Sequence, residues 1–512
     1  MRWFDPFRRL GTALAFGLLL TLPLALLAAP AVWPTQQWTR STPEAQGMDA
    51  RAVAELVRFG HDNDMDSLML TRHGHVVAEA YYAPFKPGMR HRQNSATKGV
   101  VGALTGIALA QGQLKGVDEP VLAFFPGRTV ANLDARKQAI TLQHLLDMTT
   151  GLDWVEPLAD GVPRSMIAMR QSPDWVQYVL DQPVARAPGS AFSYNSGSSH
   201  VLAAVLADRV GLPLQDYAAQ KLFGPLGIQD VVWQKDSQGR NIGGWGLYLQ
   251  TPDMAKLGYL YLQRGQWDGQ QVIPQAWVDR VFQARLPMQV SPNNDWRYAD
   301  QWWSLPERDA YMAVGFFRQI ILVMPRTGVV AAMTGRKHWS FPALLDRVAA
   351  TVKSDAALPD DAPAQQQLQA RIAEAAAGRT GEPSRPQPAW ANSLSGKRYT
   401  MAPNAMGLSS FTLHLDAVPR YEIIQQAAPG RPDLKTFTGT LGMDGRFPPA
   451  DASNPAVARA RWSDDRTLGI ELRWPEEGES AHYTLRFDGK QVAVEVLNGY
   501  GMKAALSGEA RD

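Results

Sequence analysis

The stretch from His91 to Leu114 reads HRQNSATKGVVGALTGIALAQGQL, and it holds a serine and a lysine three residues apart, Ser95 and Lys98. The small and apolar residues from Thr97 to Gln111 predict one long helix that begins beside the serine. Side chains at positions i and i+3 of a helix lie on the same face, so the amine can reach the hydroxyl. A serine hydroxyl is a weak nucleophile that needs such a base. The pattern therefore indicates a nucleophilic pair, although by itself it also fits an ordinary helix start.

The surroundings of this pair would favour acyl chemistry. Exposed N–H groups and the positive potential of a helix N-terminus stabilise a developing oxyanion. Burial and nearby positive charge would lower the proton affinity of Lys98, as a general base requires. No other lysine in the chain follows a serine at this spacing.

The overall composition is that of an ordinary globular protein. The chain has 512 residues, of which 45% are hydrophobic and 20% charged, and this length suggests more than one domain. Its 51 basic and 49 acidic residues give a net charge of +2, so we expect no nucleic-acid partner. The absence of cysteine excludes disulfides, thiolate metal sites and a cysteine nucleophile.

The N-terminal residues predict a location outside the cytoplasm. Arg2, Arg8 and Arg9 precede the apolar run LGTALAFGLLLTLPLALLAAPA, which ends in the small residues of Ala29-Pro30-Ala31. A basic head, an apolar stretch and a small-residue end are typical of a secretory signal, and the run is also long enough for a membrane anchor. We therefore expect residues 1–31 to be a signal peptide or an anchor. The protein would be exported, either periplasmic or held in the inner membrane facing the periplasm.

The pattern of residues 32–352 predicts an α/β (α+β) domain. SLMLTR and VVAEAYY surround a glycine turn, as do RQIILVMP and GVVAAMTG, and each pair reads as a β-hairpin. His73 and His75 in the first turn are more simply turn residues than metal ligands. SHVLAAVLADRVG and TPDMAKLGYLYLQRG read as helices that end near Gly211 and Gly265. These elements predict a mainly antiparallel sheet flanked by helices, with a helical subdomain.

The C-terminal third has a different composition. Residues 353–388 contain a short Ala/Gln-rich helix and then polar sequence rich in proline and glycine, which predicts a linker. Residues 389–512 contain six runs that alternate apolar and polar residues: GKRYTM, SSFTLHLD, ARARW, LGIELRW, HYTLRF and QVAVEVL. This alternation predicts a separate C-terminal all-β module.

Several ordered segments together resemble the serine β-lactamase-like family. NSATKGV resembles the nucleophile motif of that family, and ITLQHLLDMTTGLDW and APGSAFSYNSGSSHVLAAVL resemble the segments that follow it. KLFGPLGIQDVVW and WGLYLQTPDMAKLGYLYLQRGQWDGQQVIPQAWV resemble later ones, so the resemblance covers roughly Trp38 to Val352. It implies a β-lactamase/transpeptidase-like fold, with Ser95 as nucleophile and Lys98 as its base.

The second family motif implies a third catalytic residue. The motif is Tyr-x-Asn, and this chain reads Tyr194-Asn195-Ser196. Tyr194 would pass protons between Ser95, Lys98 and the leaving group. Ser196 stands where asparagine is usual and would contact the substrate. The Tyr-Asn-Ser form is more similar to the 6-aminohexanoate-dimer hydrolase and esterase branch than to true β-lactamases.

The third family motif is altered. YMAVGFFRQIILVMP resembles the G-x-x-G-Q strand of the aminohexanoate-hydrolase branch, so Gly315 would line the substrate site in place of Lys-Thr-Gly. Phe316 would supply the second oxyanion N–H beside that of Ser95. Arg318 replaces a glycine and would offer a cation to an acidic substrate group. Trp154 is expected to line the same cleft.

These features together predict an exported serine hydrolase that cleaves an ester or a linear amide of a small molecule through an acyl-enzyme. The chemistry needs neither a metal nor an organic cofactor, and the chain contains no G-x-S-x-G and no H-E-x-x-H. One alternative is a weak β-lactamase or D-Ala-D-Ala peptidase. Another is a non-catalytic protein that binds cell-envelope material on the same fold.

Overall fold

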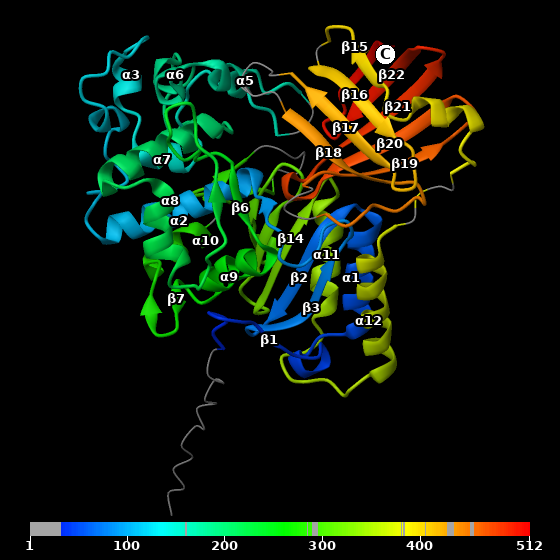
Figure 1. The fold of residues 1–512 in the computed structure, drawn as a ribbon. Coiled ribbons are helices and arrows are strands. Elements are labelled where there is room, and N and C mark those ends of the chain that lie inside the picture. Colours follow the sequence, from blue (N-terminus) through cyan, green and yellow to red (C-terminus); the bar gives the residue numbers. More distant parts are fainter. Residues whose placement is uncertain are drawn as a thin grey trace, which may run out of the picture. The chain divides into compact units, whose positions relative to one another are not determined.

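A nine-stranded sheet forms the centre of the part of the chain that contains Ser95 (Figure 1). Its strand order is β1-β3-β2-β14-β13-β12-β11-β10-β9, and every neighbouring pair is antiparallel except β1 with β3. The strands are β1 (Thr39–Arg40), β2 (Met65–Arg72), β3 (His75–Tyr81), β9 (Leu286–Pro287), β10 (Arg297–Ala299), β11 (Trp302–Leu305), β12 (Ala310–Val314), β13 (Ile320–Met324) and β14 (Val329–Gly335). The mainly antiparallel sheet and both predicted hairpins, β2–β3 and β13–β14, are confirmed.

The computed structural model describes residues 32–158, 161–283, 285–288, 295–379, 381, 384–404, 406–426, 435–450 and 455–511. The predicted signal peptide or anchor at residues 1–31 lies outside the described residues. Within the described ranges, no helix has the length and apolarity needed to cross a bilayer.

Twelve α-helices are found in the described part of the chain. They are α1 (Ala50–Asp62), α2 (Thr97–Ala110), α3 (Ala135–Gln138), α4 (Leu142–Leu146), α5 (Arg164–Gln171), α6 (Trp175–Asp181), α7 (Ser196–Val210), α8 (Leu214–Ala218), α9 (Thr251–Leu262), α10 (Gln275–Phe282), α11 (Phe341–Thr351) and α12 (Ala362–Ala377). The helix predicted from Thr97 is confirmed, and Gly211 ends α7 in the left-handed conformation as expected. The helix before Gly265 ends earlier, at Leu262.

Helices cover both faces of the sheet, which explains why neither face of its central strands is exposed to solvent. Successive side chains of a strand point to opposite faces. In β14, Val329 and Ala331 pack into one apolar cluster with α1, α11 and α12, while Val330 and Ala332 pack into another with α9. All eight residues of β2 are buried for the same reason. The sheet is therefore a rigid support for the groups that its strand ends carry.

Helix α2, which follows Ser95, is buried on nearly all sides, as expected for a helix that is apolar all round. Its glycines allow neighbours to approach closely. A Cβ atom on Gly106 would lie 2.4 Å from the Trp277 ring, and one on Gly102 would lie 2.7 Å from the Asp300 carbonyl oxygen. Close packing on every side holds the start of α2 in one position.

The C-terminal all-β module is a closed nine-stranded barrel. Along β21, the side chains of Ala481, Tyr483, Leu485 and Phe487 are buried while those between them are exposed, which is the alternation that the sequence predicts. The barrel closes through β15 with β23, and β18 with β19 is its one parallel pair. Its strands are β15 (Arg398–Met401), β16 (Leu408–His414), β17 (Arg420–Gln425), β18 (Lys435–Gly442), β19 (Val457–Trp462), β20 (Thr467–Trp474), β21 (Glu479–Asp488), β22 (Gln491–Asn498) and β23 (Lys503–Arg511).

The segment predicted as a linker contains a helix with a structural role. Helix α12 packs against α1, and its Leu368 and Ala375 belong to the apolar cluster on that face of the sheet. The predicted boundaries at residues 352, 353, 388 and 389 stay predictions.

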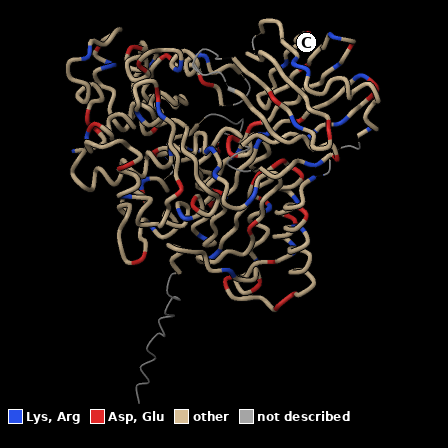
Figure 2. Tube along the Cα trace, in the orientation of Figure 1, with Lys and Arg blue, Asp and Glu red and all other residues tan. Residues whose placement is uncertain are grey.

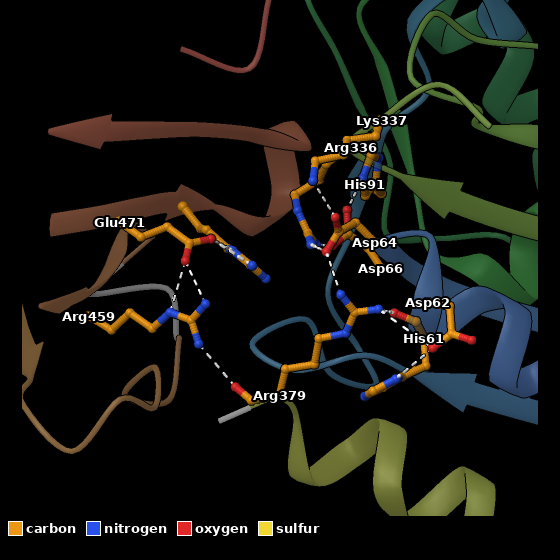
Figure 3. Close-up of polar contacts among 11 residues, drawn as sticks. His61, Asp62, Asp64, Asp66, His91, Arg336, Lys337, Arg379, Arg459 and Glu471 are labelled. Carbon is orange, nitrogen blue, oxygen red and sulfur yellow. Dashed lines mark hydrogen bonds and ion pairs between the residues drawn. The ribbon is translucent and has the colours of Figure 1, made fainter. Parts of the chain in front are cut away.

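Two groups of charged residues lie near each other, one on the side of the sheet and one on the side of the barrel (Figure 3). Asp66 of β2 is fully buried, pairs with Arg336, and contacts His91 through an Oδ2–Nε2 distance of 3.1 Å. Although burial alone would raise it, the pKa of Asp66 lies below its ordinary value because of Arg336 and the His91 hydrogen bond. On the barrel side, Glu471 lies 2.7 Å from Arg459, which also donates to the Arg379 carbonyl. Elsewhere in the described chain, acidic and basic residues are interspersed (Figure 2).

Candidate active site

The structure brings the Ser95 hydroxyl and the Lys98 amine together. Ser95 lies in the single 3-10 turn Asn94–Ala96, which runs directly into α2. The Lys98 Nζ atom is 3.0 Å from Ser95 Oγ, 2.9 Å from Ser196 Oγ and 2.7 Å from the Gly244 carbonyl oxygen. An ammonium group has three N–H donors, so each has an acceptor here. The amine is therefore held in one position beneath the serine.

Burial sets the acid–base state of Lys98. The side chain is 1% exposed, and this desolvation lowers its pKa from 10.5 to about 8, although the nearby Glu156 carboxylate opposes the change. At neutral pH, a pKa of about 8 leaves roughly a tenth of the amine unprotonated. Only that form can accept a proton from Ser95, so burial gives Lys98 the property that a general base needs.

Tyr194 is the third member of this group. It lies two residues before α7, its side chain is buried, and its phenol is near enough to the Ser95 hydroxyl for that group to affect its pKa. The Lys98 Nζ atom also lies 4.8 Å from the centre of the Tyr194 ring. Burial and the Glu156 carboxylate raise the pKa of this phenol above its ordinary value, although the neighbouring Ser95 hydroxyl opposes the change. The phenol therefore carries its proton at neutral pH and can donate it.

The Glu156 carboxylate, which the sequence did not indicate, is linked to these groups through Ser196. Glu156 Oε1 accepts from Ser196 Oγ at 2.5 Å, and its Oε2 accepts from the Ser196 backbone N–H and from Trp154 Nε1, each at 2.8 Å. A carboxylate is favourable at the first turn of a helix, here α7. Ser196 thus joins Lys98 to Glu156. Because 40 residues separate Glu156 from Ser196, no local pattern in the sequence indicates this contact.

The Gly244 carbonyl was also missed. The loop that carries it crosses the first turn of α7 closely, and a Cβ atom on Gly243 would lie 2.1 Å from the Ser199 carbonyl oxygen. Only glycine permits this approach, and the approach aims the Gly244 carbonyl at Lys98. The glycine-rich run Gly243-Gly244-Trp245-Gly246 was the available signal in the sequence.

Gly315 and Phe316 lie in the turn that follows β12, beside the nucleophile segment. A Cβ atom on Gly315 would lie 2.4 Å from the carbonyl oxygen of Gln93, two residues before Ser95. Glycine is therefore required for the two segments to meet. The Phe316 backbone N–H has no acceptor within the described ranges, and its side chain is 44% exposed. This N–H is available as an oxyanion donor, and that role stays a prediction.

The two remaining predicted substrate contacts have protein partners. Arg318 lies with its guanidinium carbon 3.8 Å from the centre of the Phe341 ring, and its Nε donates to the Trp339 carbonyl at 3.0 Å. Burial lowers the pKa of Arg318 to about 10. Trp154 donates to Glu156 and borders a cavity of about 630 Å³. Roles for either residue in binding substrate stay predictions.

That cavity is an open surface hollow, and Ser95, Lys98 and Tyr194 are not among the described residues that line it. Residues 154–157 line one side of it, together with Gly161, Val162 and Arg164. Glu156 belongs both to this lining and to the hydrogen-bonded group that holds Lys98.

A serine, a buried lysine and a tyrosine grouped at the start of an apolar helix, beside the end of an interior strand of a helix-covered, mainly antiparallel sheet, define a β-lactamase-fold serine hydrolase. The sequence model of the Beta-lactamase family matches residues 61–353, which is more than half of the chain. The chain belongs to this family, and the predicted resemblance is confirmed.

Curated relatives include a 6-aminohexanoate-dimer hydrolase and an esterase. The chain is 25% identical over 309 residues to the 6-aminohexanoate-dimer hydrolase of Paenarthrobacter ureafaciens, a match that covers 57% of this chain and 79% of the relative. It is 28% identical over 211 residues to esterase EstB of Burkholderia gladioli, covering 37% of this chain and 53% of EstB. Both matches agree with a hydrolase rather than with a protein that only binds a ligand.

Solved structures show the same fold. A protein described as a 6-aminohexanoate-dimer hydrolase from Bacillus anthracis superposes with a TM-score of 0.53 and 18% identity, over 62% of this chain and 87% of that one. EstCE1, described as a hydrolase with promiscuous acyltransferase activity, superposes with a TM-score of 0.50 and 17% identity, over 60% of this chain and 99% of its own. At these identities the likeness concerns the fold alone.

Proposed function

We propose that this protein is an exported serine hydrolase that cleaves the ester or linear amide bond of a small molecule through an acyl-enzyme on Ser95. The observation that carries the proposal is the buried Lys98 amine, which lies 3.0 Å from the Ser95 hydroxyl and has a pKa lowered to about 8. A buried base next to a partly exposed hydroxyl is the arrangement that makes a serine nucleophilic near neutral pH.

In the first half of the reaction, Ser95 Oγ attacks the carbonyl carbon while its proton moves to the neutral Lys98 amine. The backbone N–H groups of Ser95 and Phe316 would hold the oxyanion. Tyr194, which remains protonated, gives its proton to the leaving oxygen or nitrogen and regains one from Lys98. The alcohol or amine then departs and leaves an ester on Ser95.

In the second half, water attacks the acyl-enzyme while the same groups return the proton to Ser95 Oγ, and the acid is released. Glu156 and Ser196 touch no reacting atom in this scheme. They hold Lys98 in place through hydrogen bonds of 2.5 and 2.9 Å. Strong penicillinase activity is not expected, because Ala313, Val314 and Gly315 stand where the family carries Lys-Thr-Gly.

A fluorophosphonate probe and a substrate panel test the proposal together. The wild type should be labelled and Ser95→Ala should not, since the probe reacts only with an activated serine. The panel should contain short p-nitrophenyl esters, linear amides such as the 6-aminohexanoate dimer, and nitrocefin. Turnover of esters or linear amides well above nitrocefin supports the proposal. Absence of both labelling and turnover would leave the ligand-binding alternative. Cell fractionation tests export separately, and N-terminal sequencing distinguishes a cleaved signal from a retained anchor.

A further inference from the structure

Two loops of the barrel contact the segment that leads to Ser95. The loop between β20 and β21 contributes Glu477, and β21 begins with Glu479. Both carboxylates bind Arg92, with Nη1–Oε2 and Nη2–Oε1 distances of 2.8 and 2.9 Å respectively. Arg92 is 12% exposed and Glu479 is 19% exposed, so this ion pair is largely shielded from solvent and stronger than an ordinary surface pair, whereas Glu477 is 38% exposed. The barrel is thus fixed to a point three residues before the nucleophile.

Arg92 transmits this contact to the residue beside Ser95. Its Nε atom donates to Asn94 Oδ1 at 3.0 Å, and Asn94 Nδ2 donates to Gln319 Oε1 at 3.1 Å. Asn94 has a φ of 46°, in the left-handed region that is strained for a residue with a side chain. Such a conformation persists only when its surroundings hold it. The Arg92 and Gln319 bonds supply that support.

Tyr500, in the loop between β22 and β23, connects the barrel to the proposed oxyanion turn as well. Its ring stacks on Phe316, with centres 6.0 Å apart and planes 25° apart, and also contacts Phe317 at 5.1 Å. Its hydroxyl lies 3.0 Å from Glu479 Oε1 and accepts from Arg92 Nη2 at 3.3 Å. One side chain of the barrel therefore contacts both the Arg92 cluster and Phe316.

The strand that carries Arg92 is also held from within the sheet. β4 (His91–Arg92) places His91 against the buried Asp66, as Figure 3 shows. Gly478 of the barrel lies so close to this imidazole that a Cβ atom there would be 2.6 Å from its Cε1. The chain segment that leads to Ser95 is thus packed between the sheet and the barrel. A small displacement of the barrel loops would therefore also move the nucleophile.

We propose that the barrel is a working part of the hydrolytic site, in which Tyr500 and Glu479 are positioning residues that fix the Ser95 turn through Arg92 and the oxyanion turn through Phe316. The inference rests on the proposed function. Neither residue touches the reacting atoms in this scheme. Their effect is on the distance between the nucleophile and the second oxyanion donor, and a displacement of about 1 Å at a site of this kind can cost on the order of a hundred-fold in rate.

The test compares Tyr500→Ala, Tyr500→Phe and Glu479→Gln with a matched control, Glu422→Gln. Glu422 forms an ion pair of 3.0 Å with Arg398 on the barrel, so the control loses the same kind of contact away from the site. We expect Tyr500→Ala and Glu479→Gln to lower kcat for p-nitrophenyl acetate at least about ten-fold with KM changed less than about two-fold. Tyr500→Phe, which keeps the ring contact, should lose less. The melting temperatures should match that of the control.

Rates equal to that of Glu422→Gln would overturn the positioning role while wild-type turnover still supported the proposed function. Hydrogen–deuterium exchange gives a readout that does not depend on turnover. The peptides that contain Asn94 and Phe316 should exchange faster in Tyr500→Ala than in the control. Unchanged exchange in both peptides would refute the inference even if the wild type hydrolysed none of the substrates.

Discussion

Replacing Glu156 with glutamine should move the pH dependence of acylation to lower pH. Lys98 accepts the Ser95 proton only when neutral, so kcat/KM of the wild type should rise with pH and level off above about 8. The Glu156 carboxylate stabilises the charged amine and raises its pKa. Without that charge, less opposes the effect of desolvation, and the pKa of Lys98 falls further. A larger fraction of the amine is then neutral at any given pH below the plateau.

The structure bounds the size of the effect. The Lys98 Nζ to Ser196 Oγ distance of 2.9 Å and the Ser196 Oγ to Glu156 Oε1 distance of 2.5 Å add to 5.4 Å, so the two charges lie no farther apart than this. Their attraction is then at least about 0.8 kcal/mol in a water-like dielectric and about 3 kcal/mol at an effective dielectric constant of about 20. Dividing by about 1.4 kcal/mol per pH unit gives an acidic displacement of about 0.5 to 2 units.

The measurement is kcat/KM for a p-nitrophenyl ester between about pH 5.5 and about pH 9.5, with Ser95→Ala as the blank for spontaneous hydrolysis. Glu156→Asp serves as the matched control, because it keeps the charge and should keep the midpoint closer to that of the wild type. Coincident midpoints in the wild type and Glu156→Gln would refute the electrostatic link. A flat wild-type profile through pH 8 would refute the role of Lys98 as the base.

Three further substitutions test the remaining groups. Lys98→Ala should lower the rate of fluorophosphonate labelling at Ser95 at least about a hundred-fold while circular dichroism remains native, and labelling at the wild-type rate would exclude the base role. Tyr194→Phe should lower kcat for an amide by about 10² to 10⁴, and unchanged amide turnover would show that another group protonates the leaving nitrogen. Gly315→Ala should destabilise the fold by about 1–3 kcal/mol, because the added methyl would lie 2.4 Å from the Gln93 carbonyl; denaturant unfolding measures this, and an unaltered midpoint would contradict it.

The sequence predicted those parts of the fold that follow from local patterns. Apolar runs beside glycine turns identified β2 and β14, which are buried on both faces, and alternation identified β21, which has one buried face. The turn at His73 and Gly74 identified the first hairpin. Closure of the barrel was not predictable, because it depends on the pairing of β15 with β23, whose partners Arg398 and Arg511 are more than a hundred residues apart. The α12 helix has few large apolar residues, so its packing on α1 left little trace in the sequence.

In the candidate site, the contact between residues close in sequence could be predicted, but the contacts between residues far apart in sequence could not. Ser95 lies in the turn that runs into α2 and Lys98 in the first turn of that helix, so their spacing indicated a contact between them. The role of Tyr194 was predicted from the resemblance to a family motif rather than from any physical pattern. Glu156 and the Gly244 carbonyl reach Lys98 only through tertiary packing, and the barrel residues near Ser95 follow it by almost four hundred positions.

In the proposed mechanism, two opposed electrostatic effects on one amine bring its pKa to about 8, close to neutral pH. Complete burial without partners would make a charged Lys98 costly in the folded protein, whereas a carboxylate in direct contact would keep it protonated. The structure avoids both extremes by placing the Ser196 hydroxyl between the amine and Glu156 and by adding the Gly244 carbonyl as a neutral acceptor. The interposed hydroxyl weakens the carboxylate's effect without removing it. Desolvation therefore remains the larger influence on Lys98, and its pKa falls to about 8, where a base can both take and return a proton near neutral pH.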